Sequence, residues 1–315
     1  MKFFEKHKKI KILGIIVLLV FLFIVWLCAS IIIKMTGGAV KIVDREDISE
    51  EELLSDKVPI IREEQIEDSV FNVLLIGSDS RSPDEESGRS DSMMLVSLNV
   101  TKNKATIVSF MRDSLVEIEG YGLTKLGHSY AYGGVGLTIN TINQTYDLDI
   151  QNYITINFDN LEDVIDKLGG VEVPISAEEA AYYRRNGRSY IVEGVNLLDG
   201  EDALKHARNR SLDNDFGRTR RQRSVMNGIY RKVMENKDPA DVLVLIKYCM
   251  EQVRTNMEVD FIYDMVMLVL SKDNLLVQQT SIPAAGTYTN ETYDGMSVLN
   301  VDIEANKEVL RRFLY

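Results

Sequence analysis

The chain has 315 residues, of which 45% are hydrophobic and 27% charged, and its formal net charge is −12. This composition excludes a disordered tail, a collagen-like fibre and a polytopic membrane protein. The acidic excess argues against nucleic acid as a partner. Two cysteines and three histidines argue against a disulfide framework and a zinc site.

An uncharged apolar stretch at residues 12–33 follows a basic N-terminus. As a helix it would span about 33 Å, enough to cross the hydrocarbon core of a membrane. A cleaved signal peptide has a shorter apolar region and small residues at its cleavage site, and the bulky Trp26 and Leu27 argue against a lipoprotein site at Cys28. We therefore predict a single-pass signal-anchor, with residues 1–11 as a cytoplasmic tail and the rest outside the cell.

Residues 34–69 are rich in acidic side chains, which favours a solvated stalk between the membrane and a folded domain at 70–315. Strand-like and helical patterns then alternate without strict βαβ repetition, which predicts an α/β fold with a mixed central sheet sandwiched by helices. In chain order we predict strands at 70–77, 93–100, 105–111 and 153–158, a helix at 160–168, a strand at 171–175, a helix capped by Asp199 and ending near 207, helices at 216–235 and 239–254, a strand at 275–282 and a helix at 301–314.

Two aspartates flank the polar loop between the first two predicted strands. If these strands are antiparallel neighbours, Asp79 and Asp91 lie at the same end of the sheet. Such a pair of carboxylates suits Mg²⁺ or Mn²⁺, and Mg²⁺ often adds substrate phosphates as ligands. The alternative is that both aspartates only form turns. Arg81 and Arg89 lie in the same loop.

A cationic stretch interrupts the acidic domain: between positions 205 and 223 seven lysines and arginines face only Asp213 and Asp215. Arg208 and Arg210 share a face if the chain there is extended, whereas Arg218, Arg221 and Gln222 share a helical face. Guanidinium groups match phosphate oxygens, so an anionic ligand is one interpretation and a salt-bridged helix is the other. Arg112 after the third strand either points into a cleft or simply pairs with Asp113, and Lys125 is a further candidate phosphate contact. Arg220 and Arg223 are offset around the helix, and we expect them to face solvent.

Other catalytic patterns are missing from the chain. Residues 133–136 (GGVG) lack the following G-K-[ST] of a phosphate-binding loop, so we interpret them as a helix-entry turn. The sequence has no G-x-S-x-G elbow and no S-x-x-K motif, which argues against a serine acyl-transfer enzyme. We expect His128 to be a packed structural histidine.

The segments that carry the candidate aspartates and arginines, taken in chain order, resemble the motifs of the LytR-CpsA-Psr (LCP) family. The similarity covers about residues 70–235 and is carried by the segments 72–81 (NVLLIGSDSR), 89–93 (RSDSM), 109–113 (SFMRD), 125–134 (KLGHSYAYGG), 169–171 (GGV), 198–200 (LDG), 207–210 (ARNR) and 215–222 (DFGRTRRQ).

The resemblance implies an LCP-type domain in a Gram-positive type envelope. It implies a Mg²⁺-dependent phosphotransferase that moves an anionic glycopolymer from a polyprenyl-pyrophosphate carrier to peptidoglycan as a phosphodiester. Motif matching assigns the metal to Asp79 and Asp91. The residues that it assigns to the pyrophosphate are Arg89, Arg112, Arg208, Arg210, Arg218 and Gln222, with Arg81, Lys125 and Arg221 as further candidates. The residues that it assigns to catalysis are Asp79, Asp91, Arg89, Arg112 and Arg210.

The chain departs from the family pattern at Met111, where proline is usual, at Gly127, where asparagine is common, and at Ser129, where alanine is common. The charged groups are intact, so the expected function stands. Two alternatives remain open at this point: a module that binds the lipid-linked polymer without turnover, and an envelope regulator.

Overall fold

The structure, a computed structural model, describes residues 70–78, 90–235, 239–272 and 275–315. The predicted tail, signal-anchor helix and stalk at 1–69 lie outside the described residues. In the part of the chain that is described, no helix combines the length and the apolar character needed to cross a membrane. The division at residues 12–33 and 34–69 therefore stays a prediction.

Six strands of the described chain form a mixed central sheet. Across the sheet they are β10 (Leu276–Ile282), β3 (Lys104–Phe110), β2 (Ser90–Asn99), β1 (Val70–Ser78), β6 (Asn152–Asn157) and β9 (Val253–Thr255). The strand β1 is antiparallel to β2 and parallel to β6, while β3 is antiparallel to β2 and parallel to β10. The predicted mixed α/β class is confirmed.

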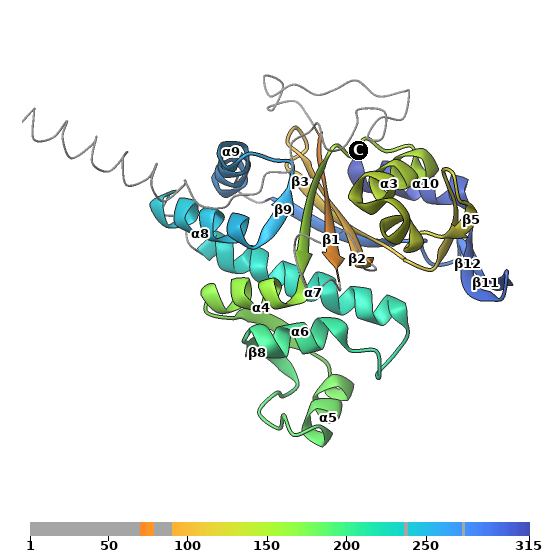
Figure 1. Ribbon diagram of the computed structural model, residues 1–315. Coiled ribbons are helices and arrows are strands. Elements are labelled where there is room, and N and C mark those ends of the chain that lie inside the picture. Colours follow the sequence, from red (N-terminus) through yellow and green to blue (C-terminus); the bar gives the residue numbers. More distant parts are fainter. Residues whose placement is uncertain (1–69, 79–89, 236–238, 273–274) are drawn as a thin grey trace, which may run out of the picture. The chain divides into compact units, whose positions relative to one another are not determined.

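Helices pack on both faces of this sheet (Figure 1). Strand residues such as Leu74, Leu95 and Phe110 share one core with α3 (His128–Tyr146) and α10 (Ile303–Leu314). Because side chains alternate along a strand, Ser109 points to the opposite face, where it accepts a hydrogen bond from Arg223 of α7 (Asp215–Glu235). The helix α7 therefore covers the second face.

Two smaller sheets flank the central one. β11 (Tyr288–Tyr293), β12 (Met296–Val301), β4 (Ser114–Ile118) and β5 (Gly122–Lys125) form the first, and β7 (Val171–Ile175) and β8 (Gly194–Leu198) form the second. The β7–β8 hairpin shares a separate hydrophobic core with α4 (Phe158–Lys167), α5 (Ala177–Arg185), α6 (Gly200–Arg208) and α7. The helices α8 (Pro239–Glu251) and α9 (Val259–Ser271) pack against each other.

Most predicted elements are confirmed to within a few residues, including the Asp199 cap, whose side chain accepts a hydrogen bond from the backbone of Asp202. Two boundaries were wrong. The helix predicted at 239–254 ends at Glu251, because the chain then pairs with β6 as β9. The helix predicted at 301–314 begins at Ile303, because Val301 ends β12 and Asp302 caps the helix. In both places the sheet pairing overrides the local helical pattern.

The glycine pair of the predicted helix-entry turn lies inside α3 as a break. Gly133 and Gly134 have non-helical backbone angles, and Gly134 has φ of +63°, which a residue with a side chain rarely adopts. The preceding turn, from His128, is already helical. The pair therefore changes the direction of a helix that has begun, and His128 contacts the hydroxyl of Thr124 through Nδ1 at 3.0 Å.

Candidate functional site

The last residues of β1, β3 and β6 and the first residues of β2 lie together at one end of the central sheet, which is called the sheet edge below. Ser78, the last residue of β1, pairs with Ser90 of β2 and with Asn157 of β6. The last residue of β3, Phe110, pairs with Met93. The segment after β3 therefore leaves the sheet beside the turn between β1 and β2.

A register shift in the β1–β2 pair falls at this same edge. Gly77 pairs with Ser92 and Ser78 pairs with Ser90, so Asp91 is the extra residue of a bulge. Bulges redirect the chain and are frequent next to functional sites. The pairing confirms that β1 and β2 are antiparallel neighbours, as the metal-site hypothesis required. Asp79, Arg81 and Arg89 lie outside the described residues, as does the side chain of Asp91.

Arg112 is anchored through its backbone neighbours. The Met111 amide donates to the carbonyl of Ile282, and the Gly127 amide donates to the carbonyl of Arg112, both at 2.8 Å. A Cβ on Gly127 would lie 3.0 Å from the Cβ of Arg112, so the glycine that departs from the family pattern makes room for this arginine. The Met111 side chain is buried beside Thr219 of α7.

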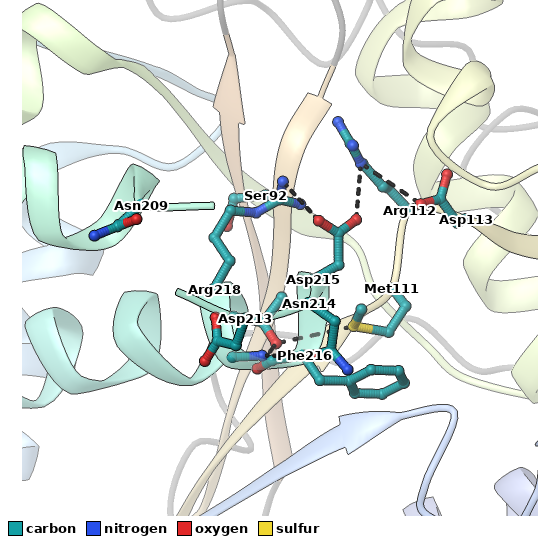
Figure 2. A network of polar contacts seen from close by, with 12 residues as sticks. Ser92, Met111, Arg112, Asp113, Asn209, Asp213, Asn214, Asp215, Phe216 and Arg218 are labelled. Atoms are coloured by element: carbon teal, nitrogen blue, oxygen red, sulfur yellow. Dashed lines mark hydrogen bonds and ion pairs between the residues drawn. The ribbon is translucent and has the colours of Figure 1, made fainter. Parts of the chain in front are cut away.

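Asp215, the first residue of α7, joins two of the predicted arginines (Figure 2). Its Oδ2 lies 3.3 Å from Nε of Arg112, and its Oδ1 lies 3.0 Å from a terminal nitrogen of Arg218. The side chain of Arg218 is 3% exposed and that of Arg112 is 26% exposed. One carboxylate thus aligns two guanidinium groups from different elements at the sheet edge.

Lys125 extends this network through Asp113. Its Nζ lies 2.8 Å from Oδ1 of Asp113, whose Oδ2 lies 3.9 Å from Nε of Arg112. Burial raises the pKa of Asp113, but the hydrogen bond and charge of Lys125, with the charge of Arg112, outweigh it and hold the pKa below its ordinary value. Among these described residues three cations share two carboxylates, an excess of positive charge that favours an anion.

Gln222 and Arg223 fasten α7 to the sheet. The Ser92 hydroxyl donates to the side-chain oxygen of Gln222 at 3.2 Å, next to the Asp91 bulge. Arg223 donates to the hydroxyls of Ser109 and Ser281, each at 2.8 Å, and burial lowers its pKa to about 10. The prediction that Arg223 faces solvent was wrong, because α7 packs on the sheet face where β3 and β10 present Ser109 and Ser281. It is confirmed for Arg220, whose side chain is 68% exposed.

Arg221 takes a different direction from Arg218. It makes a two-pronged pair with Asp213 at 3.0 and 2.7 Å, donates to the carbonyl of Asn209, and lies 3.6 Å from Glu179 of α5. Its side chain is 2% exposed. A Cβ on Gly217 would lie 1.8 Å from the Asp213 carboxylate, which explains a glycine in the G-R-x-x-R-Q core. The structure places Arg221 in a structural cluster, and its predicted contact to pyrophosphate stays a prediction.

Arg208 and Arg210 line a cavity of about 760 Å³ between α4, α5 and α6. Arg210 follows Asn209, whose backbone is extended, so the predicted extended arrangement holds at that point. The structure thus brings Arg112, Lys125 and Arg218 into one network and puts Arg208 and Arg210 on a neighbouring cavity. In the described ranges no cluster of three or more histidine, cysteine, aspartate or glutamate side chains could hold a metal ion.

Asp215 is the residue that sequence reasoning undervalued. The sequence indicates it as a counter-charge in the cationic stretch and as the first residue of the 215–222 segment, but gives it no role in the site, although its spacing of three residues from Arg218 puts the two on one helical face. The contact to Arg112 joins positions 103 residues apart. No local pattern indicates that pairing.

Comparisons with known proteins agree on one family. The model described as the LytR_cpsA_psr family matches residues 34–313. A polyisoprenyl-teichoic acid–peptidoglycan teichoic acid transferase, TagU of Bacillus cereus, is 36% identical over 200 residues, which are 62% of this chain and 63% of that protein. The match thus spans less than two thirds of that relative's length.

Solved structures extend the similarity to the fold. The crystal structure of B. subtilis TagT matches with a TM-score of 0.68 and 25% identity, covering 85% of this chain and 98% of that one. A LytR-CPS2A-psr family protein, YwtF (TagT), with bound octaprenyl pyrophosphate lipid matches with a TM-score of 0.61 and 25% identity over 81% of this chain and 94% of that one.

Proposed function

This chain belongs to the LytR_cpsA_psr family, and we propose that it transfers an anionic glycopolymer from a polyprenyl-pyrophosphate carrier to peptidoglycan. The single observation that carries the proposal is the network in which Asp215 aligns Arg112 and Arg218 at the sheet edge where the Asp91 bulge lies. Two planar donor forks held at one place suit the oxygens of a diphosphate. The names of the relatives that act on teichoic acid or hold octaprenyl pyrophosphate support the same assignment.

The proposed reaction is an in-line displacement at phosphorus. The oxygen of an acceptor hydroxyl forms a bond to the phosphorus that carries the glycopolymer, and the bond from that phosphorus to the polyprenyl phosphate breaks. The hydroxyl proton leaves to a base, and polyprenyl phosphate departs with the bonding electrons. Arg112 and Arg218 would neutralise the charge that develops on the leaving phosphate, which is the larger part of phosphoryl-transfer catalysis.

An apolar surface beside the arginines is suited to the polyprenyl tail. On the sheet face opposite α3, the side chains of Val73, Leu75 and Ile154 are only half-buried, although β1 and β6 lie inside the sheet. Phe71 on this face contacts Phe261 of α9, whose apolar side chains are mostly half-buried as well. Incompletely covered apolar side chains in the middle of a sheet indicate a site for an apolar ligand.

For the cofactor we propose Mg²⁺, held by Asp79 and Asp91, with Mn²⁺ as a possible substitute. The antiparallel β1–β2 pair ends at Ser78 and has its bulge at Asp91, and carboxylate oxygens are the donors that this ion prefers. A bound ion would add charge stabilisation to the diphosphate. We expect chelation with EDTA to abolish transfer and added Mg²⁺ to restore it; full activity in EDTA would contradict this part.

For the location we propose a single-pass membrane protein whose 70–315 domain lies outside the cell, as the basic flank and apolar stretch at 12–33 predict. The name of the relative TagU, a teichoic acid transferase with peptidoglycan as its acceptor, is consistent with this topology, because peptidoglycan lies outside the cell membrane. A topology reporter fused to the C-terminus should read as extracytoplasmic.

The decisive experiment measures transfer by purified protein from a polyprenyl-pyrophosphate glycopolymer to peptidoglycan. Changing Arg112 or Arg218 to Ala should lower the rate about 10²-fold or more, by comparison with the loss of a single oxyanion donor. Arg220→Ala, an exposed position on the same helix as Arg218, is the matched control and should leave the rate unchanged. Unchanged transfer in both site variants would refute the assignment. Retained lipid binding without any turnover in the unaltered protein would favour a non-catalytic binding module.

A further inference from the structure

The cavity of about 760 Å³ beside Arg208 and Arg210 has polar walls that the proposed diphosphate site does not use. The helix α4 contributes Asp159 and Glu162, α5 contributes Tyr182, and Asn186 follows the end of α5. Asp159 and Glu162 are three residues apart and therefore share one face of α4. The volume is within the range of small-molecule sites, about 300–1,000 Å³. It is large enough for a short oligosaccharide.

The cavity adjoins the sheet edge that carries the arginine network. Asp159 comes two residues after Asn157, and Asn157 pairs with Ser78 at the end of β1. The helices α4 and α6 run in opposite directions: the amide of Gly200 at the start of α6 donates to Asp166 near the end of α4, and Arg208 at the end of α6 lines the cavity together with Asp159 at the start of α4. The end of α6, with Arg208, therefore lies toward the start of α4, and both are on the side of the sheet edge.

The charges on the walls argue against a polyanion as the occupant. Three acidic side chains, Asp159, Glu162 and Glu201, line the cavity together with four cations. Two of these cations, Arg188 and Lys205, are paired with Glu201. Arg188 also pairs with Asp202 at 2.6 Å. A nearly neutral cavity of carboxylate, amide, phenol and guanidinium groups suits hydroxyl and acetamido groups better than a chain of phosphates, which would meet repulsion from α4.

We propose that this cavity binds the acceptor, an uncharged amino-sugar segment of the peptidoglycan glycan, with Asp159 and Glu162 accepting hydrogen bonds from its hydroxyl or amide groups and Tyr182 packing against a sugar ring. The inference rests on the proposed transferase function and adds the place where the second substrate binds. The acceptor then approaches the diphosphate from the α4–α6 side, while the lipid tail lies on the apolar face of β1 and β6.

The test compares three variants in acceptor-dependent kinetics. Asp159→Ala and Tyr182→Ala should each raise the KM for a soluble peptidoglycan glycan fragment about tenfold, because each loses one contact worth about 1.4 kcal/mol. The kcat at saturating acceptor and the Kd for octaprenyl pyrophosphate should stay within about twofold. Asp163→Ala is the matched control, because Asp163 is an exposed acid of α4 outside the cavity. Thermal unfolding of each variant checks that the fold is kept.

Direct binding separates this inference from the proposed function. Calorimetric titration of the fragment into the protein needs no turnover, and the two cavity variants should lose about tenfold in affinity. If the unaltered protein binds the fragment but transfers nothing, the proposed function fails and the cavity assignment stands. If transfer occurs and the cavity variants keep both the KM and the affinity, the cavity assignment fails. A lowered affinity for the lipid-linked polymer with an unchanged acceptor KM would overturn it as well, because the cavity would then hold the donor.

Discussion

Two arginine–carboxylate clusters lie at the start of α7, and they differ in the ratio of guanidinium groups to carboxylates. In the open cluster, Asp215 is shared between Arg112 and Arg218, and Arg112 is partly exposed. In the closed cluster, Arg221 is buried and faces two carboxylates, Asp213 and Glu179. In the closed cluster one guanidinium group faces two carboxylates, whereas in the open cluster the described residues set two guanidinium groups against one carboxylate. The difference separates an arginine that stabilises the fold from arginines that can bind an anion.

The largest expected difference between the two clusters is in the free energy of unfolding when Arg221 is replaced. Arg221→Met should lower the free energy of unfolding by about 3 kcal/mol, because it leaves the Asp213 and Glu179 carboxylates without their buried partner. Arg112→Met should cost less than about 1 kcal/mol, as partly exposed ion pairs do. Urea unfolding followed by circular dichroism measures both. Equal costs for the two variants would show that the clusters do not differ in the way described.

Low pH should reduce the stability of the fold around the closed cluster through His206, which is buried next to the hydroxyl of Tyr183. Burial lowers the pKa of His206 to about 4, below the ordinary value of 6.5. Between these values the unfolded chain binds more protons than the folded one, so stability is full above pH 6.5 and is lost as the pH falls toward 4. The full effect is on the order of 3 kcal/mol. His206→Asn should flatten the stability profile between pH 6.5 and 4; an unchanged slope would assign the pH dependence to other groups.

The open cluster is tested from its carboxylate. Asp215→Asn keeps the size of the side chain but removes the charge that aligns Arg112 and Arg218. We expect the kcat of transfer to fall about tenfold through loss of alignment. Affinity for inorganic pyrophosphate should be unchanged or higher, because the variant adds net positive charge. Binding measured by calorimetry and turnover measured separately give the split, and a parallel loss of both would mean that Asp215 does not act by positioning.

The smallest expected effect is at Gly127. Gly127→Ala puts a Cβ 3.0 Å from the Cβ of Arg112 and 3.2 Å from its carbonyl oxygen, so Arg112 must shift by a few tenths of an ångström. We expect a two- to fivefold lower rate of transfer, about 0.4–1 kcal/mol, and little change in stability. Gly120→Ala is unsuitable as a control because Gly120 has φ of +78°. Ala177→Gly on α5 changes one methyl group far along the chain and should leave the rate unaltered.

Local signals in the sequence determined five strands of the central sheet, all but β9, together with the Asp199 cap and the family, because alternation, capping and motif order are properties of neighbouring residues. They also placed Asp91 at a strand edge and Arg218 with Gln222 on one helical face. The same helical spacing grouped Arg221 with Arg218, and the structure separates them, because Asp213 and Glu179 hold Arg221 in a second core.

Only the tertiary structure decided which charges meet. Arg112 and Asp215 are 103 residues apart, and their contact depends on β3 and α7 reaching the same edge of the sheet. The cavity between α4, α5 and α6 depends likewise on an antiparallel helix pair that no spacing within the chain predicts. The sequence thus specified the chemistry of the side chains, and packing between distant segments specified their arrangement, because pairing energies act through space while sequence patterns record only neighbours along the chain.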